Sequence, residues 1–167
     1  MVGQLLELAR TENIKMQTEC LEFSRLVEGE TLPFESIAFD KGILLKTEIA
    51  ENIYVMGNST QLSQLVSILV DNAIRHSNKG KEITVKLIDN RNSTNLSVIN
   101  AGEPIAPEKI EHLFERFYRA DEARSGNDNH YGLGLAIAKA IVTAHKGKID
   151  VKCYEGLVEF KVTLQKV

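Results

Sequence analysis

The sequence has few residues that cross-link small proteins and no segment suited to a lipid bilayer. Of its 167 residues, two are cysteines and none is tryptophan. Cys20 and Cys153 are far apart and show no CxxC or Cys/His spacing, so we expect two reduced thiols and no disulfide or metal site. No run of about 18 apolar residues is present, and no signal peptide is visible. These absences predict a soluble, cytoplasmic unit.

The sequence also lacks an excess of basic residues. Its net charge of -3 at pH 7 argues against a generic nucleic-acid binder. The motifs HExxH, GxSxG and Walker A are absent, and the histidines show no metal-ligand spacing. Hydrophobic residues make up 43% of the chain and charged residues 26%, which is enough for a core. We expect one domain, or one domain with a helical appendage.

Apolar spacing predicts a mixture of helices and hairpins. Helices are expected where apolar residues recur at helical spacing, over a short segment ending near residue 13 and over 24–40, 58–77, 107–118 and 132–145. Strands are expected over 19–23, 43–49, 53–55, 82–88, 96–99, 148–154 and 157–164. This order predicts an α/β (α+β) two-layer sandwich, with a mixed, mostly antiparallel sheet packed on about three helices.

Several residues are expected to begin, bend or end these elements. Ser24 is predicted to cap the second helix, and Pro33 to kink or divide it. Its inward residues are predicted to be Leu26, Val27, Phe34, Ile37 and Ala38. Asn58-Ser59-Thr60-Gln61 is similar to a capping box. A polar loop is expected over 89–95.

Two glycine-bearing segments frame a long polar loop. The first is Asn100-Ala101-Gly102-Glu103-Pro104-Ile105, and the second, Gly132-Leu133-Gly134-Leu135, opens a helix. Glycines at the start of a helix let backbone N–H groups face a phosphate, and the helix dipole favours the anion. The loop between them, Arg119 to Tyr131, has a length that is usually functional or disordered. This arrangement predicts nucleotide binding.

The helix over 58–77 carries a polar stripe beside its apolar face. The stripe consists of Ile68, Asn72, Arg75, His76 and Lys79. An asparagine can give one oxygen to Mg²⁺, which takes its other ligands from water and phosphates. Arg75 and His76 would then meet phosphate oxygens. The alternative is a helix edge whose polar residues lie at the solvent boundary.

Asn100 and the aromatic segment over 114–119 can each be interpreted in two ways, as part of a binding site or as a purely structural feature. Asn100, at a strand end, can present a carbonyl oxygen and an amide to adenine, or can hold its own backbone in a turn. Phe114 and Phe117 are expected to share a helix face in the core. Arg116 and Arg119 can close over a phosphate, or can form surface pairs with neighbouring carboxylates.

Together these segments resemble the catalytic and ATP-binding domain of bacterial sensor histidine kinases. That domain belongs to a superfamily shared with type II topoisomerases, heat-shock chaperone ATPases and mismatch-repair ATPases. Residues 64–77 (QLVSILVDNAIRHS) are similar to the N box, and residues 114–121 (FERFYRAD) closely match the F box. Residues 100–105 and 132–139 (GLGLAIAK) lie at the two glycine boxes. Residues 5–12 (LLELARTE) are similar to the end of the second dimerisation helix.

The resemblance implies that the domain binds ATP and Mg²⁺ and donates the γ-phosphoryl group to a histidine outside this chain. Asn72 would bind Mg²⁺, Arg119 would reach the γ-phosphate, and these two would be the catalytic residues. Residues 119–131 would form an ATP lid. The implied nucleotide-binding residues are Asn72, Arg75, His76, Asn100, Gly102, Ile105, Tyr118, Arg119, Gly132, Leu133, Gly134 and Leu135. Residues 1–13 would end a truncated dimerisation helix, and residues 14–167 would form the catalytic domain.

Four departures from the family pattern are visible. Ile68 replaces the first asparagine of the N box, Asn100 replaces an aspartate that accepts the adenine amino group, and Pro104 replaces a second glycine. No histidine is followed by the Glu/Asp and Pro of the phosphoacceptor box.

The resemblance also implies partners. The parent protein would be a homodimer anchored in the bacterial inner membrane, with its own dimerisation domain and a response regulator as partners. This chain would touch neither membrane nor nucleic acid, and by itself it is expected to be a monomer with slow turnover. The alternatives are a nucleotide-binding signalling module without kinase activity, or another ATPase or serine kinase of the same superfamily.

Overall fold

The structure, a computed structural model, describes residues 3, 5–6, 9, 17–119 and 132–167. The helices are α2 (Phe23–Asp40), α3 (Ser59–His76), α4 (Pro107–Ile110) and α5 (Gly134–Ala144). The strands are β1 (Glu19–Glu22), β2 (Leu44–Ile49), β3 (Tyr54–Gly57), β4 (Glu82–Asp89), β5 (Ser93–Ala101), β6 (Lys148–Tyr154) and β7 (Leu157–Gln165). No helix in these residues is long and apolar enough to cross a bilayer.

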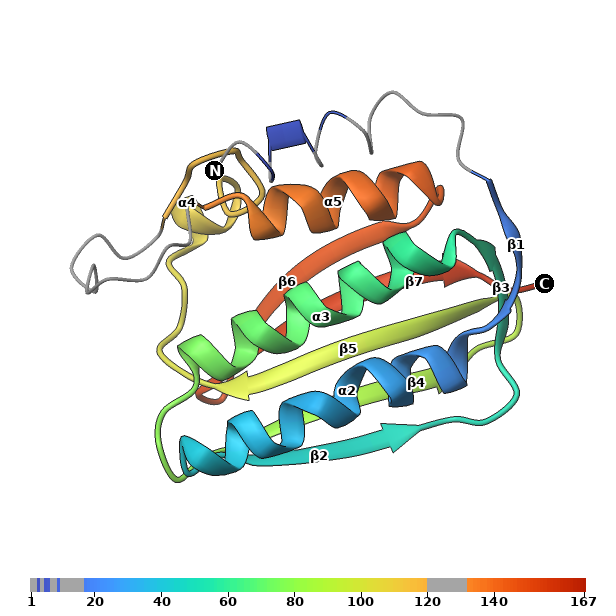
Figure 1. Ribbon diagram of the computed structural model, residues 1–167. Helices are drawn as coiled ribbons and strands as arrows, with labels where there is room; N and C mark the ends of the chain where they lie inside the picture. The colour runs from blue at the N-terminus through green and yellow to red at the C-terminus, as the bar shows by residue number, and fades with distance from the viewer. Residues whose placement is uncertain (1–2, 4, 7–8, 10–16, 120–131) are drawn as a thin grey trace.

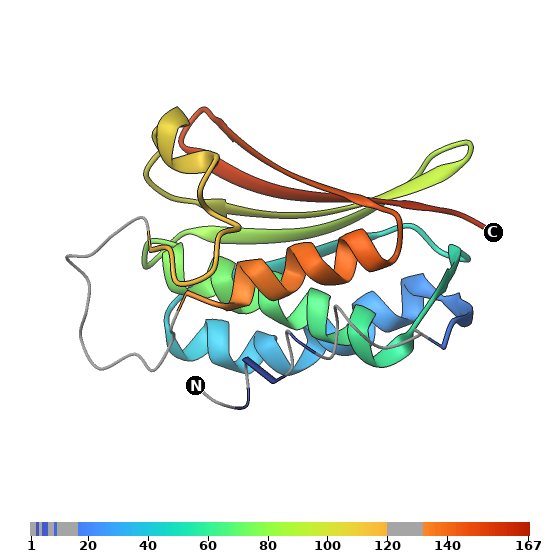
Figure 2. The same ribbon diagram turned by 90° about the horizontal axis from the view of Figure 1, so that it is seen from above.

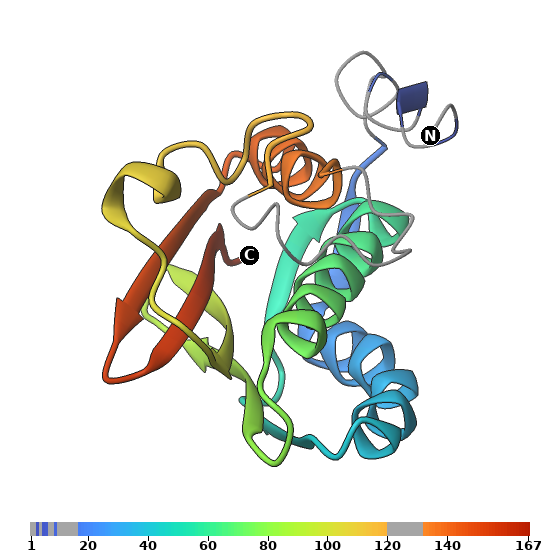
Figure 3. The same cartoon turned by 90° about the vertical axis from the view of Figure 1, so that its left-hand side faces the viewer.

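Five strands form the main sheet in the order β2-β4-β5-β7-β6. Only β2 and β4 pair in parallel, and the other neighbours are antiparallel. A separate two-stranded sheet joins β1 to β3. Helices α2, α3 and α5 lie on one face of the main sheet, so the molecule has two layers (Figures 1, 2 and 3). The predicted α+β sandwich with a mixed, mostly antiparallel sheet is confirmed.

Strand alternation explains which face of the sheet is covered. Val158, Phe160, Val162 and Leu164 of β7 are buried, while the intervening residues are more exposed. Successive side chains of a strand point to opposite faces, so this pattern gives the sheet one apolar face. The other strands supply the same face with residues such as Val85, Leu96 and Val98.

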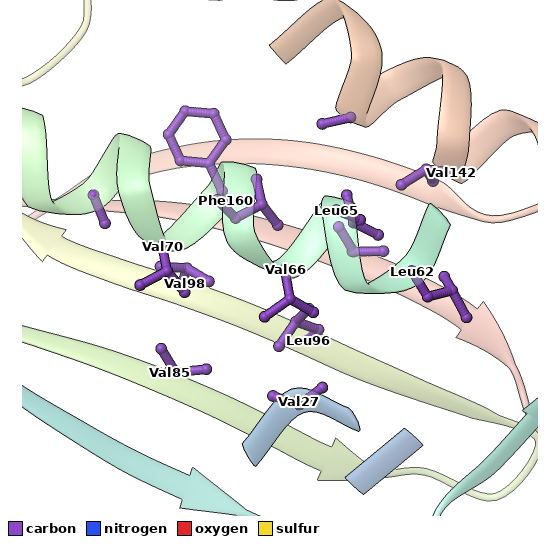
Figure 4. Close-up of a cluster of buried hydrophobic side chains, with 14 of the residues drawn as sticks. Val27, Leu62, Leu65, Val66, Val70, Val85, Leu96, Val98, Val142 and Phe160 are labelled. Carbon is purple, nitrogen blue, oxygen red and sulfur yellow. The ribbon is translucent and has the colours of Figure 1, made fainter. Parts of the chain in front are cut away.

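Helix α3 fills the space above this apolar face. Its residues at helical spacing are almost completely buried, and they include every residue predicted for its apolar face: Leu62, Leu65, Val66, Leu69, Val70 and Ala73. Figure 4 shows Val66 and Val70 of α3 beside Leu96 and Val98 of the sheet, with Val27 of α2 and Val142 of α5 also in the cluster. Truncating a buried leucine of this kind to alanine costs about 2–5 kcal/mol. The core therefore fixes the position and rotation of α3.

Two contacts fix the beginning of α3. The Asn58 side chain accepts a hydrogen bond from the Gln61 backbone N–H at 3.0 Å, which is one half of the predicted capping box; the Gln61 side chain does not return the other half. The Asn58 backbone N–H donates to Nε2 of His145 at 3.1 Å, while Nδ1 of His145 lies 2.7 Å from the Ile141 carbonyl. His145 therefore holds its proton on Nδ1 and accepts through Nε2. This ring ties the end of α5 to the beginning of α3.

The second predicted helix differs in three respects from expectation. Ser24 lies inside α2 and does not cap it, because its hydroxyl donates to the Ala50 carbonyl and accepts from the Ile53 N–H. Pro33 does not divide the helix, which runs unbroken through it. Burial of residues on both sides of Pro33 outweighs the single backbone bond that proline removes. Ile37, predicted to face inward, is 45% exposed.

Three predicted element boundaries were also wrong. The polar loop over 89–95 is shorter, because β4 extends to Asp89 and β5 begins at Ser93. The helix expected over 107–118 ends at Ile110. The helix expected from Gly132 begins at Gly134. The predicted short helix near the N-terminus falls largely outside the described residues.

The His145 contact predicts a pH dependence of stability. Burial lowers the pKa of His145 below its ordinary value of 6.5. A histidine of this kind binds fewer protons in the folded state, so its stabilising contribution is complete above pH 6.5 and is lost as the pH falls through the folded-state pKa. We expect the free energy of unfolding, measured with urea, to decline below pH 6.5, and His145→Gln to reduce that decline.

His112→Gln provides the control. Glu115 raises the pKa of exposed His112, so any stabilisation from His112 is complete below pH 6.5 and is lost as the pH rises above it. This variant should leave the decline below pH 6.5 in place. An unchanged decline in His145→Gln would contradict the assignment.

Candidate functional site

Several of the predicted site residues lie on or near the second half of α3. The end of β5, the end of α3 and the beginning of α5 lie at the same end of the domain (Figures 1 and 2). The Asn78 N–H, just beyond α3, donates to the Ala101 carbonyl of β5 at 3.4 Å. On the other side, Ile68 Cγ2 lies 3.6 Å from the point that a Cβ on Gly134 would occupy. The structure thus brings both glycine segments to the same helix.

The polar residues of α3 lie at the boundary of the core. Asn72 is half-buried and follows Asp71, whose carboxylate accepts from Arg75 Nε at 2.8 Å. His76 ends the helix and is exposed. Lys79 lies beyond the helix, so its predicted place in the stripe was wrong. Ile68 packs against the core, which explains how an apolar residue is accommodated one turn before Asn72.

Asn100 is buried on the inner face of the sheet. It shares this face with Leu96 and Val98 because the side chains of β5 alternate. Its partners across the sheet are Ile83 and Val158, which are also buried. Asn100 is 1% exposed, and its Nδ2 atom has no hydrogen-bond partner among the described residues. A turn-forming asparagine accepts through Oδ1 from the backbone N–H two residues on, and here that N–H, of Gly102, donates to the Gly156 carbonyl instead.

The segment after Asn100 is held against the β6–β7 hairpin. The Gly102 N–H donates to the Gly156 carbonyl at 3.1 Å, and the Ile105 N–H lies 3.4 Å from Cys153 Sγ. A Cβ on Gly102 would lie 3.1 Å from Asn100 Nδ2 and 3.2 Å from the carbonyl oxygen of His76. Glycine therefore lets the backbone approach the buried amide and the end of α3.

The aromatic segment is not helical, which corrects one expectation. Phe114 is partly buried and meets Phe160 edge-on, with ring centroids 6.4 Å apart. Lys139 Nζ lies 5.4 Å from the centroid of the Phe114 ring. Phe117, predicted to share the core, is 53% exposed and has a φ of 64°. A helix cannot pass through this conformation, so the two rings point in different directions.

A close backbone contact joins Phe117 to Gly132. The Phe117 N–H donates to the Gly132 carbonyl at 3.2 Å. Gly132 has a φ of 68°, and a Cβ there would lie 2.8 Å from the Tyr118 carbonyl oxygen. Tyr118 is half-buried and Arg119 is exposed. The predicted lid lies outside the described residues apart from Arg119.

Helix α5 begins without a side-chain cap. Leu133, its N-cap residue, is 1% exposed and cannot accept a hydrogen bond through its side chain. Gly134 opens the helix and Leu135 is half-buried. The first amides of a helix have no partner within it. Here they suit an anion, because backbone N–H groups and the helix dipole both favour negative charge.

Sequence reasoning missed one feature of this region. Ser77 follows α3 directly, and its Oγ is buried without a hydrogen-bond partner among the described residues. A polar residue between a helix end and a strand start was the available signal, but it also fits an ordinary C-cap. No group of three or more His, Cys, Asp or Glu side chains that could hold a metal occurs in the described part. A metal bound here would take most of its ligands from another molecule.

The Phe117–Gly132 contact can be tested with two alanine substitutions. Gly80 has a φ of 78°, and no heavy atom lies within 4 Å of the point that a Cβ there would occupy, so Gly80→Ala meets only the conformational cost of about 1–2 kcal/mol. Gly132→Ala meets the same cost and a collision with backbone, which adds about 1–3 kcal/mol. Urea denaturation should show the larger loss for Gly132→Ala. Equal losses would argue against a close contact at Gly132.

Comparison with known proteins agrees with this geometry. Residues 57–166 match the family described as histidine kinase-, DNA gyrase B-, and HSP90-like ATPase. The chain is 34% identical to the sensor protein DltS of Streptococcus agalactiae over 167 residues, covering 99% of this chain and 42% of DltS. It is 35% identical to the sensor histidine kinase CusS of Escherichia coli, covering 98% of this chain and 34% of CusS. It therefore spans less than half the length of these relatives.

A solved structure gives the same result. The catalytic domain of the histidine kinase ThkA superposes with a TM-score of 0.81 at 27% identity, covering 90% of this chain and 97% of that domain. The sequence match covers α3, both glycine segments and the C-terminal hairpin. The chain therefore belongs to the family of histidine kinase-, DNA gyrase B- and HSP90-like ATPases, and it is similar to the ATP-binding catalytic domains of sensor histidine kinases.

Proposed function

We propose that this domain binds Mg-ATP and donates the γ-phosphoryl group to a histidine on a dimerisation domain that is not part of this chain. The observation that carries the proposal is the buried amide of Asn100. It lies on an apolar surface, has an unpartnered nitrogen, and is close to Gly102. An unpartnered buried polar group is costly unless a ligand completes it. Membership of an ATPase family makes a nucleotide the natural ligand.

The proposed binding residues divide between base and phosphates. Asn100, Gly102 and Ile105 would hold the base, because Gly102 lies beside the buried amide and the same segment is held to the β6–β7 hairpin at Ile105. Tyr118 and Arg119 would border the nucleotide from the aromatic segment. The phosphates would meet the start of α5 and the end of α3, through Gly132, Leu133, Gly134, Leu135, Arg75 and His76. An uncapped helix start and these cations both favour phosphate.

Asn72 is the residue proposed to hold Mg²⁺. Its amide oxygen is a hard ligand, and magnesium needs only one or two protein ligands when phosphates and waters supply the rest. The α3 residues fit this limited role, since Ile68 cannot coordinate metal and packs against the core. When bound, Mg²⁺ would neutralise phosphate charge. The residues of this chain would position the γ-phosphoryl group toward the acceptor, and Arg119 would stabilise its negative charge.

The remaining partners follow from a histidine kinase function. We propose that the parent protein is a homodimer anchored in a bacterial inner membrane, with a response regulator as the next phosphate acceptor. Residues 1–13 would end a dimerisation helix, and residues 14–167 would form the catalytic unit. Because the acceptor histidine and its general base would lie elsewhere, the isolated domain should bind nucleotide and turn it over slowly.

The magnesium assignment is tested by Asn72→Ala. Calorimetric titration with ATP in the presence of Mg²⁺ should show an affinity about tenfold or more below the wild type. In EDTA the two proteins should bind ATP equally, because no metal contact exists to be lost. Asn92→Ala, in the exposed turn between β4 and β5, is the matched control and should match the wild type. Equal magnesium-dependent affinity for wild type and Asn72→Ala would remove the assignment.

Transfer of phosphate is tested with labelled ATP and an added dimerisation domain from a sensor histidine kinase. Arg119→Ala should lower the transfer rate about a hundredfold, with little change in ATP affinity, because its charge acts mainly on the transferring group. Arg91→Ala, an exposed arginine in the β4–β5 turn, should transfer normally. If the wild type binds ATP but transfers no phosphate, the alternative of a signalling module without kinase activity is favoured. That alternative is supported by Asn100, which is uncharged where the family usually has an aspartate. Rapid ATP hydrolysis by the domain alone would favour another ATPase.

A further inference from the structure

One corner of the domain holds two buried polar groups without partners. In the described part of the chain, three buried side-chain atoms lack a hydrogen-bond partner: Gln61 Oε1, Ser77 Oγ and Asn100 Nδ2. Ser77 and Asn100 both lie where the end of α3 meets the end of β5, as the bond from Asn78 to Ala101 shows. Because native proteins leave few such groups unpaired, this corner is suited to form hydrogen bonds with a ligand, with Asn100 Nδ2 as a donor and Ser77 Oγ as a donor or acceptor.

Among the described residues around Asn100, its amide is the main polar group available to contact a base. Its cross-strand neighbours Ile83 and Val158 are apolar and buried. The buried polar residues of the described part are Ser24, Thr31, Thr94, Ser97 and Asn100, and none of them is acidic. Among these residues, therefore, the site contains no buried carboxylate, which would be a group that only accepts hydrogen bonds.

The chemistry of an amide differs from that of a carboxylate in one decisive respect. An ionised carboxylate only accepts hydrogen bonds, whereas an asparagine offers two N–H donors and a carbonyl acceptor. Adenine carries an amino donor at position 6, and guanine and hypoxanthine carry a carbonyl acceptor there. A carboxylate would repel that carbonyl. Rotation of the Asn100 amide by half a turn presents its acceptor to an amino group or its donor to a carbonyl.

We propose that the base site accepts 6-oxopurine nucleotides, represented by GTP and ITP, as well as ATP, and that Asn100 sets this relaxed selectivity. The proposal rests on the nucleotide-binding function proposed above. The unpartnered Nδ2 is the donor that a 6-carbonyl requires. The Ser77 hydroxyl in the same corner can donate or accept a hydrogen bond, so it does not favour a 6-amino group over a 6-carbonyl group.

The experiment is calorimetric titration of the whole chain with Mg-ATP, Mg-GTP and Mg-ITP at pH 8. The wild type should bind the three nucleotides with dissociation constants within about tenfold of one another, because a hydrogen bond is available to each. In Asn100→Asp the ionised carboxylate should retain ATP and weaken GTP and ITP. The ratio of the dissociation constants for the 6-oxopurine nucleotides to that for ATP should then rise to about a hundredfold or more, because the carboxylate and the 6-carbonyl oxygen are both acceptors. The high pH keeps the buried carboxylate ionised.

Asn95→Asp is the matched control. Asn95 lies on the same strand, and its Oδ1 accepts from Thr163 Oγ1 at 2.9 Å, away from the inner face that holds Asn100. This variant should keep the wild-type ratios. Retained ATP binding by Asn100→Asp would show that the variant is folded.

The outcomes separate the two proposals. If the wild type binds ATP but rejects GTP and ITP by a hundredfold or more, relaxed selectivity is wrong and the ATP-binding function stands. If all three bind similarly in both proteins, Asn100 does not set the selectivity. If no purine nucleotide binds the wild type, the proposed function and the inference both fall.

Discussion

Burial of one face of α3 is the constraint on which the rest of the domain depends. Leu62, Leu65 and Val66 are completely buried between the sheet and the neighbouring helices. Successive helix residues are rotated by about 100°, so turning α3 by one position would force polar side chains into this apolar space. The apolar residues therefore decide the direction of Asn72. A functional residue here is aimed by core residues that have no chemistry of their own.

Elements with a clear apolar period were predictable, and elements fixed by distant contacts were not. The sequence period located α3 and β7 almost residue by residue because burial and periodicity act together there. The segment after Ile110 has aromatic residues at helical spacing, but the left-handed conformation of Phe117 ends that pattern. This conformation goes with a contact to Gly132, fifteen positions along the chain, which no local pattern contains. Ser24 is a similar case, because its partners lie on another segment.

The candidate site divides in the same way. Its residues could be selected from the sequence because asparagine, glycine and arginine occur in the order typical of the family, and the structure brings α3, the end of β5 and the start of α5 to one end of the domain. The burial and hydrogen-bond partners of each residue could not be predicted from this order. Burial of Asn100 follows from strand alternation, but its missing partner depends on what surrounds it in three dimensions. Ser77 was overlooked because a serine at a helix end has an ordinary explanation.

The bond from Gly102 to Gly156 has a consequence for the order in which the domain is made. Gly102 lies at the buried amide, while Gly156 belongs to the turn between the last two strands. On a ribosome the first glycine emerges more than fifty residues before the second. The backbone at Gly102 therefore cannot gain this bond until the chain has been synthesised through β6 and the turn that follows it. A nucleotide bound at the proposed site would therefore stabilise only chains whose last hairpin has joined the sheet, because a ligand stabilises the state that it binds.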